Sequence, residues 1–455
     1  MSNEMILAAM VAAPGVLFAA LAMLWLLGWT PGERFIARLT ATVYSVSAVA
    51  AFWLAFGMWQ SGERLVKGPE GHWFAIGEYH FDLSLVADRL SLPLLTLTIL
   101  LVGLVGVFSV RYLHRDRGYF RFFLLLHLFA FGALLVLSAG TFDLLLGGWE
   151  LVGISSVLLI AFFDQRREPV RNGIRVFAFY RISDLGLLLG LFFLHTISHT
   201  TSVAEMFEGS WPNQTTTLAV PDATLIALLL LVAAAGKSAQ APFSGWLPRA
   251  MEGPTPSSAI FYGAISVHLG AYLLLRAEPI LRTSPWAIAG VAAVGTVTAL
   301  LATVTHRAST DAKTSLAYAG MAQLGIIFVE IALGFPQLAL AHIMGHAVVR
   351  TLQFLRAPSM LHDYHRVHAA AGGHLDRTGE HYEKFLPEGV RLWLYRAAVD
   401  RGYYDAILDR FVTAPVERLA RLLEAFEPSL HAGPSTQVPD EIAPRKSQLA
   451  ERVRS

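Results

Sequence analysis

Eleven long apolar stretches constrain the fold of this chain more than any other feature. A helix needs about 20 mainly apolar residues to cross a lipid bilayer. The chain is 55% hydrophobic and 15% charged, with a mean hydropathy of +0.51, which is too apolar for a soluble protein. We therefore expect an all-α, polytopic membrane helix bundle over residues 1–357. The predicted spans lie near 5–29, 36–59, 84–110, 119–139, 141–163, 173–197, 222–244, 255–277, 285–305, 314–333 and 336–357.

Basic residues in the loops predict how these spans are oriented. Cytoplasmic loops usually carry an excess of Lys and Arg. The loops on one side hold only Arg64, Lys67, Arg276 and Arg282, and a short hairpin is expected there at 72–81. This bias predicts an N-terminus outside and a C-terminus in the cytoplasm. The opposite, basic loops carry Arg34, Arg38, Arg111, Arg115, Arg117, Arg166, Arg167, Arg171, Arg249, Arg307 and Lys313.

Lys237 ends a run of 14 uncharged residues that begins at Ala223, and four prolines follow it before residue 257. A helix cannot continue through such a segment, because proline lacks a backbone N–H and clashes with the preceding turn. Inside a bilayer, irregular backbone is stable only where protein buries it or where it lines a wet cavity. A broken helix over 237–256 that carries a lysine therefore favours an ion path. The alternative is a lysine that reaches the membrane interface beside an ordinary loop.

Two further groups of charges fall inside predicted spans. Glu150 lies among glycines that permit close helix packing. Arg181 and Asp184 are one helical turn apart and can form an ion pair. A charge removed from water needs a partner or a hydrated path, so these residues are candidates for ion translocation. The alternatives are a hydrogen bond from Glu150 to a neighbouring helix and a static Arg181–Asp184 pair.

A stripe of ionisable residues marks the eleventh predicted span. His342, His346 and Arg350 are spaced at i, i+4 and i+8 and share one helix face. Histidine titrates near neutral pH, so the stripe is suited to proton transfer. The alternative is a pair of histidines that only hydrogen-bond to neighbouring helices.

Four sequence motifs resemble the proton-translocating, antiporter-like subunits of respiratory complex I and of Mrp-type sodium/proton antiporters. The resemblance implies that Lys237 is the central protonatable residue of a half-channel and that Glu150 tunes it. It also implies that groups such as Arg181 and Asp184 exchange partners with that pair. The motifs are GWELVG at 148–153, GKSAQ with WLPRAM and GPTPSSA at 236–259, DAKTSLAYAGMAQ with Lys313 at 311–323, and AHIMGHA at 341–347.

The sequence departs from the family pattern at two positions of the expected relay. A channel histidine of the eighth span aligns with Tyr262, whereas His268 follows later in the same span. A protonatable lysine of the eleventh span is replaced by Arg350, which does not readily release its proton. His268, His342 and His346 are therefore candidates for ion translocation, and the family's usual relay is not expected to continue beyond His346.

Beyond residue 357 the sequence changes character. Residues 358–389 are polar, contain five histidines and read as a linker, with a zinc site as the alternative. Residues 390–430 are amphipathic and too charged to cross a membrane, which predicts partner-docking or membrane-surface helices. Residues 431–455 are predicted to be a disordered tail. The five histidines are His362, His365, His368, His374 and His381.

The family continues with further helices after the eleventh span, and this sequence does not. That shortened pattern, together with residues 404–412, resembles the DabB family, the membrane subunits of bacterial DAB inorganic-carbon pumps. The resemblance implies a bacterial inner-membrane location and a cytoplasmic, DabA-like zinc protein similar to β-carbonic anhydrases as the partner. Ion flow through the membrane subunit would then drive one-way hydration of CO₂ to bicarbonate on that partner.

Three classes of function follow from these patterns. The first is the ion-conducting subunit of a carbon pump, the second a subunit of a respiratory or Mrp-type complex, and the third a non-conducting scaffold for a partner. In each of them the chain itself is expected to hold no catalytic site and no cofactor, with zinc only in the partner. The sequence has no cysteine, so it has no disulfide or thiolate metal site. Proton and sodium both remain open as the coupling ion.

Overall fold

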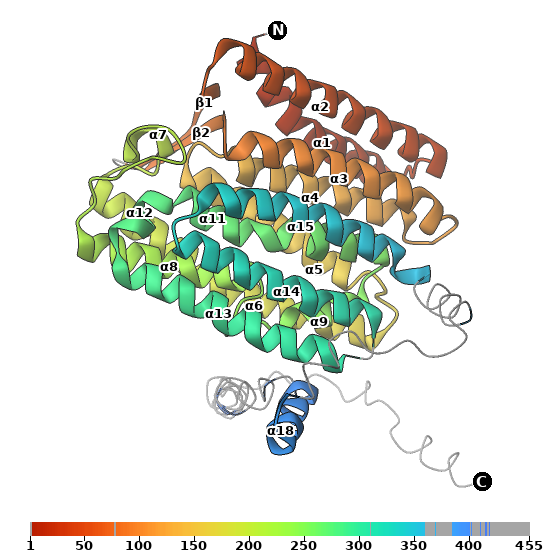
Figure 1. Ribbon diagram of the computed structural model, residues 1–455. Helices are drawn as coiled ribbons and strands as arrows, with labels where there is room; N and C mark the ends of the chain where they lie inside the picture. Colours follow the sequence, from red (N-terminus) through yellow and green to blue (C-terminus); the bar gives the residue numbers. More distant parts are fainter. Residues whose placement is uncertain are drawn as a thin grey trace, which may run out of the picture. The chain divides into compact units, whose positions relative to one another are not determined.

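The computed structural model describes residues 2–76, 79–309, 311–359 and 385–400, together with residues 369, 402, 410, 415 and 418. The chain divides into one unit over residues 1–402 and a second over residues 403–455. Every helix and strand labelled in Figure 1 belongs to the first unit. Most of the predicted linker at 358–389, most of the docking region at 390–430 and the whole tail at 431–455 lie outside the described residues.

The prediction of eleven membrane spans is confirmed for the described residues (Figure 1). Ten spans are single helices, and the eighth is a series of short helices that ends with α11. The spans are α1 (Asn3–Leu26), α2 (Glu33–Ser61), α3 (Ser91–Tyr112), α4 (Tyr119–Ser138), α5 (Phe142–Ile160), α6 (Arg167–Ser198), α8 (Val220–Lys237), the series Thr255–Arg276, α13 (Pro285–Ala308), α14 (Ala312–Ala332) and α15 (Pro336–Arg356).

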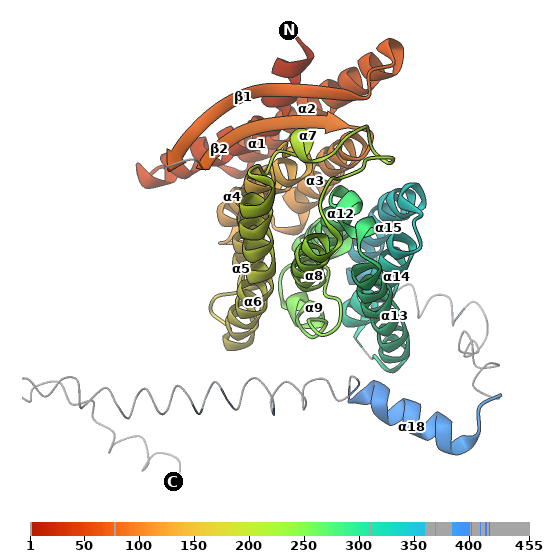
Figure 2. The same cartoon turned by 90° about the vertical axis from the view of Figure 1, so that its left-hand side faces the viewer.

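An antiparallel hairpin of β1 (Leu65–Ile76) and β2 (Tyr79–Asp88) connects α2 to α3. Figure 2 shows the two strands lying across one end of the helices, and they pack on α1, α3, α4 and α5. The expected hairpin is present but longer than 72–81. The prediction of a helix from residue 84 was wrong, because residues 84–88 pair with β1 and α3 begins only at Ser91.

The predicted break after Lys237 is confirmed and begins as soon as α8 ends. Residues 238–245 form no helix, and Ala239 has the left-handed φ of 51°. Six short elements then lead back into a regular helix: α9 (Trp246–Arg249), η1 (Ala250–Glu252), α10 (Thr255–Ser257), the π-helix η2 (Ser258–Ala264), η3 (Ser266–His268) and α11 (Leu269–Arg276). The apolar window of the span 255–276 is completely buried in the bundle. Irregular backbone therefore lies inside protein rather than against lipid, as a bilayer requires.

Short helices and one amphipathic helix complete the described chain. The short ones are α7 (Val203–Met206), α12 (Glu278–Thr283) and η4 (Ala357–Ser359). Helix α18 (Glu388–Val399) packs on α13 and buries Ala398, while Trp393 and Tyr395 stay exposed. A helix of 12 residues is too short to span a bilayer.

Asp88 joins the hairpin to the helices. Its carboxylate accepts hydrogen bonds from the backbone N–H groups of Leu90 at 3.1 Å and Ser91 at 2.8 Å, which stabilises the start of α3. It also forms a buried ion pair with Arg276 at the end of α11, with 2.5 Å between Asp88 Oδ2 and Arg276 Nη1. Burial raises the pKa of Asp88, but the charge of Arg276 outweighs that effect and holds it below its usual value. The Tyr272 hydroxyl accepts two further hydrogen bonds from Arg276.

Replacing Arg276 with Gln should lower the free energy of unfolding by about 3–5 kcal/mol, because it leaves a buried carboxylate without its counter-ion. Thermal unfolding of the full chain in detergent measures the loss. The matched control is Lys67→Gln, which breaks an exposed ion pair with Glu70 on the hairpin and should change stability by less than about 1 kcal/mol. Equal stability of the two variants would contradict a role for Asp88 and Arg276 in holding the hairpin.

Candidate functional site

Lys237 is the last residue of α8 and its side chain is fully buried. Its Nζ donates a hydrogen bond to the backbone carbonyl of Trp149 at 3.0 Å. The ammonium also lies 4.7 Å from the Trp149 ring centroid and 4.6 Å from that of Tyr180, within the range of cation–π attraction. Among the described residues, no carboxylate oxygen lies within 4.0 Å of it. Lys237 is therefore held by aromatic rings and one carbonyl instead of a direct counter-ion.

Arg181 on α6 binds both nearby carboxylates. Its Nη2 donates to Glu150 on α5 and, at 2.9 Å, to Asp184 Oδ2 one turn further along α6. We expected Glu150 and Lys237 to form the central pair, and that expectation was wrong, because Arg181 takes the Glu150 carboxylate. The link to Lys237 runs through Trp149, whose indole N–H donates to Asp184 Oδ1 at 2.6 Å.

The network extends from the buried interior to the surface of the bundle. The side chains of Asp184 and Lys237 are almost completely buried, whereas those of Glu150 and Arg181 are 37% and 40% exposed. A cavity of about 350 Å³ opens beside Glu150, Arg181 and Asp184. A charged pair therefore lies on the outer face of α5 and α6, at mid-span in both helices.

Buried hydroxyl groups lie near Lys237 and in the short elements that lead to His268. The hydroxyls of Tyr180, Tyr262 and Ser266 are buried and make no hydrogen bond of good geometry within the described chain. Tyr180 faces Ser266, and the Trp246 ring lies 5.1 Å from the ring of Tyr180 and 5.8 Å from that of Tyr262. Buried polar groups of this kind are usually satisfied by ordered water. Ser266 and Tyr262 belong to the elements that lead directly to His268.

His268 begins a hydrogen-bonded chain with a defined direction. A carbonyl oxygen only accepts, so His268 Nδ1 donates to Ala264 O at 2.6 Å. Arginine only donates, so Arg350 Nε donates to His346 Nε2 at 3.1 Å. His346 Nδ1 then carries the proton that is donated to His268 Nε2 at 2.8 Å. The structure thus brings together three residues that the sequence marked, as a chain of two neutral imidazoles capped by a guanidinium.

Glu330 is a residue that the sequence analysis missed. Its Oε1 lies 2.9 Å from His342 Nδ1, and its Oε2 is buried without a partner in the described chain. Gln323 Oε1 lies 3.1 Å from the other ring nitrogen of His342, and the His342 ring centroid is 6.2 Å from that of His346. The signal that could have found it is simple, because Glu330 is the only acidic residue within the predicted span at 314–333.

Lys313 lies apart from these networks. Its Nζ donates to the carbonyls of Met251 at 3.3 Å and Gly253 at 3.0 Å in the irregular segment. Free carbonyls of a broken helix need donors, so Lys313 fixes the segment that follows Lys237. Lys313, which was predicted as a translocation residue, therefore contacts the irregular segment and not the network around Lys237.

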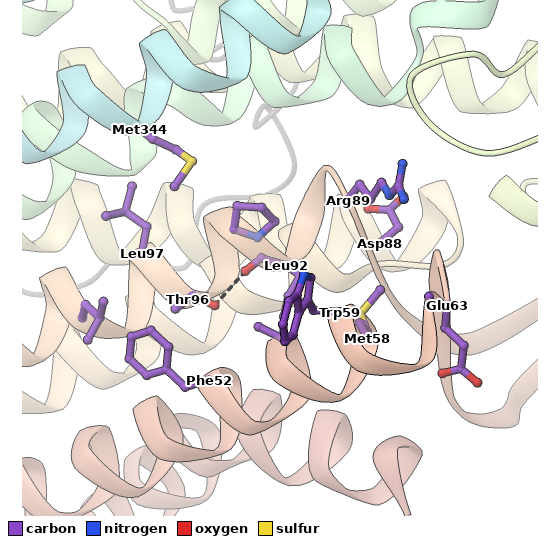
Figure 3. Close-up of a pocket in the computed structure, with 14 residues that line it drawn as sticks. Phe52, Met58, Trp59, Glu63, Asp88, Arg89, Leu92, Thr96, Leu97 and Met344 are labelled. Atoms are coloured by element: carbon purple, nitrogen blue, oxygen red, sulfur yellow. Dashed lines mark hydrogen bonds between the residues drawn. The ribbon is translucent and has the colours of Figure 1, made fainter.

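A second cavity of about 600 Å³ lies between α2 and α3, shown in Figure 3, and it is lined mainly by apolar side chains such as Phe52, Leu97 and Met344. Its charged lining residues lie toward one end, where Asp88 is already bound to Arg276. This cavity therefore lacks convergent polar groups for chemistry. Within the described residues, no group of three or more His, Asp or Glu is arranged to hold a metal. The five linker histidines lie outside the described residues.

Comparison with known proteins shows the family to which this chain belongs. Residues 139–373 match the sequence family described as NADH:quinone oxidoreductase/Mrp antiporter, TM. Residues 73–123 match the family described as NADH-Ubiquinone oxidoreductase (complex I), chain 5 N-terminus. The first match covers more than half of the chain, and the chain belongs to this family of antiporter-like membrane subunits.

Curated relatives are longer than this chain. NADH-quinone oxidoreductase subunit L of Campylobacter jejuni is 33% identical over 330 residues, which is 72% of this chain and 53% of that protein. NADH-ubiquinone oxidoreductase chain 5 of Cryptococcus neoformans is 34% identical over 276 residues, 60% of this chain and 41% of that protein. The chain thus spans about half the length of the curated relatives it matches, or less.

Two solved structures share the fold. A chain of the Mrp complex from Dietzia sp. DQ12-45-1b superposes with a TM-score of 0.64 at 25% identity, over 78% of this chain and 37% of that chain. A chain of the archaeal membrane-bound sulfane sulfur reductase superposes with a TM-score of 0.65 at 18% identity, over 78% and 70%. The second likeness is one of fold alone.

Proposed function

We propose that this chain is the proton-conducting subunit of a multi-subunit membrane complex. The observation that carries the proposal is the environment of Lys237, an ammonium buried at the end of a broken helix without a direct counter-ion in the described chain. Such a charge is costly in a bilayer and is rarely found without a function. Membership of the antiporter-like family and likeness to a chain of an Mrp complex support the same class.

Arg181 supplies a switch for this ammonium. In the observed arrangement its single positive charge is shared between Glu150 and Asp184, so only one net negative charge remains to stabilise a proton on Lys237. If Arg181 moves toward Glu150 alone, Asp184 is released and stabilises the ammonium through Trp149. A return of Arg181 would then expel the proton from Lys237. The exchange needs only side-chain rotation, because Arg181 already touches both carboxylates.

The expelled proton has a polar route toward α15. Waters bound by the hydroxyls of Tyr180 and Ser266 would connect Lys237 to His268. From there the hydrogen bond to His346 continues the route, and the ring of His342 beside it leads to Glu330. Arg350 does not release protons, so it ends the chain instead of extending it. Proton exit through Glu330 is therefore our proposal for this chain.

The exposed Glu150–Arg181 pair supports a membrane-spanning partner. Lipid does not solvate an ion pair, so charges at this depth usually face protein or a water-filled cavity. Both side chains are more than one third exposed on the face formed by α5 and α6. We propose that a neighbouring subunit covers this face in the complete complex.

Replacing Lys237 with Ala should abolish proton movement while the complex still assembles. The complex, purified through a tag on this chain and reconstituted into liposomes, is energised by an imposed membrane potential, and a pH-sensitive dye reports proton flux. The control Lys67→Ala removes an exposed lysine of the hairpin and should leave the flux unchanged. Normal flux in an assembled K237A complex would favour the non-conducting scaffold.

Glu330→Gln and His342→Gln should each reduce the flux at least tenfold, because each removes one partner of the proposed exit pair. The double variant should be no slower than either single variant, since groups that act in one step are not additive. Glu208→Gln, an exposed acid in the loop after α7, serves as the control. Losses that multiply in the double variant would show that the two residues act separately.

Two complexes fit this subunit, and the comparisons favour the first. Respiratory and Mrp-type complexes supply the named relatives and one of the solved structures. The inorganic-carbon pump, with a DabA-like zinc protein as partner, rests on the resemblance to the DabB family. The exposed aromatic residues of α18 are suited to docking such a soluble partner. Residues 404–412, which also carry the resemblance, lie outside the described residues.

Purification of the tagged chain from its native membrane should recover at least one other protein, and mass spectrometry distinguishes the two complexes. Several membrane subunits resembling complex I or Mrp proteins would identify the first. A zinc-containing protein resembling β-carbonic anhydrases would identify the second, and deletion of residues 390–455 should then release it. Recovery of the chain alone would contradict both complexes.

A further inference from the structure

A cavity of about 590 Å³ lies where α1 ends, α4 begins and α5 ends. It is separate from the networks described above and shares no residue with them. Helix ends mark the level at which a bilayer changes from acyl chains to headgroups. All the loops that line it belong to the basic set predicted to face the cytoplasm.

Three arginines line this cavity, and two of them have no acidic partner. Arg121 forms an ion pair with Asp164 at 2.7 Å and donates to the carbonyl of Phe162. The hydrogen bond and charge of Arg121 hold the pKa of Asp164 below its usual value, so this pair stays ionised at neutral pH. Arg117 and Arg166 make no ion pair with any described carboxylate. Two guanidinium groups are thus left to bind an anion.

The other groups at the mouth are one carboxylate and the start of α4. Asp116, the remaining carboxylate of the lining, accepts a hydrogen bond from the backbone N–H of Gly118 at 2.7 Å. No side chain caps the N-terminus of α4 at this point, and its first turn contains no acid. Helix α4 is 20 residues long, and its uncapped N-terminus adds positive electrostatic potential at the mouth of the cavity.

The remaining lining is apolar and aromatic, which distinguishes the cavity from a site for a soluble anion. Trp25 near the end of α1 is more than half exposed, and Phe120 and Leu124 of α4 are half-buried beside it. The Phe163 ring stacks under the Arg166 guanidinium at 5.1 Å. The cavity thus combines arginines with an aromatic and apolar lining. This combination suits a ligand with one charged end and one hydrocarbon end.

We propose that this cavity is a binding site for an anionic phospholipid, with the headgroup phosphate on Arg117 and Arg166 and an acyl chain along Trp25, Phe120 and Leu124. Basic pockets between membrane helices on the cytoplasmic side commonly bind acidic headgroups. Guanidinium groups suit this role because their planar donors match phosphate oxygens in pairs. The site ties the ends of α1, α4 and α5 together through one lipid.

Native mass spectrometry of the full, delipidated chain in detergent tests the proposal. Titration with dioctanoyl phosphatidylglycerol should show one saturable site, and dioctanoyl phosphatidylcholine should bind at least tenfold more weakly. The double variant Arg117→Gln/Arg166→Gln should weaken phosphatidylglycerol binding at least tenfold. The control Arg38→Gln/Arg171→Gln removes two exposed arginines from the same basic set outside the cavity and should bind like the unchanged protein.

Thermal unfolding tests whether weaker lipid binding in the variant reflects the loss of this site or a loss of folding. Phosphatidylglycerol should raise the unfolding temperature of the unchanged protein and of the control, but not of the Arg117/Arg166 variant. Equal melting temperatures without lipid would confirm that all three proteins are folded. Inorganic phosphate that stabilises the unchanged protein as strongly as phosphatidylglycerol would identify a soluble-anion site and overturn the proposal. Unaltered lipid binding in the Arg117/Arg166 variant would also overturn it.

Discussion

The burial of an ammonium at the end of an interrupted helix is the constraint on which the rest of this structure depends. The bilayer interior offers no free hydrogen-bond partners, so the end of α8 and the Lys237 side chain both need protein groups around them. The Trp246 indole donates to the carbonyl of Gly236, and Trp149 supplies the carbonyl that binds Lys237. A side chain at Gly236 would overlap Ser183 on α6. Close packing of α6 on α8 therefore fixes the position of the ammonium.

The same packing explains why the charges form one network that runs from the buried interior to the surface of the bundle. Because α6 carries both Arg181 and Asp184, the helix that packs against Lys237 also carries its electrostatic control. Asp184 points inward to the Trp149 indole, whereas Arg181 reaches outward to Glu150 on α5. A change at the exposed face, such as contact with a partner subunit, would alter the electrostatic potential at Lys237. The pair at the surface and the buried lysine are thus joined by one chain of contacts through Asp184 and Trp149.

Most of the fold could be predicted from the sequence, and the side-chain partners could not. Long apolar runs define spans by length alone, so all eleven were found. The apolar residues before Ser91 suit a strand as well as a helix, and only pairing with β1 decides between them. Glu150, Lys237 and Arg181 were recognised as members of a site because charges in apolar runs are rare. Their pairing depends on the rotation of three helices, which spacing along the chain does not determine.

Arg350 limits where the proton route that we propose can lead. A lysine at this place could pass a proton onward, whereas a guanidinium keeps its charge and only donates to His346 Nε2. That fixed charge opposes a second positive charge on His346, so the His268–His346 pair holds an extra proton most easily away from Arg350. The His342 ring lies 6.2 Å from that of His346, and His342 Nδ1 contacts Glu330 Oε1. Glu330 Oε1 lies 2.9 Å from His342 Nδ1, and this contact is where the proton route that we propose ends.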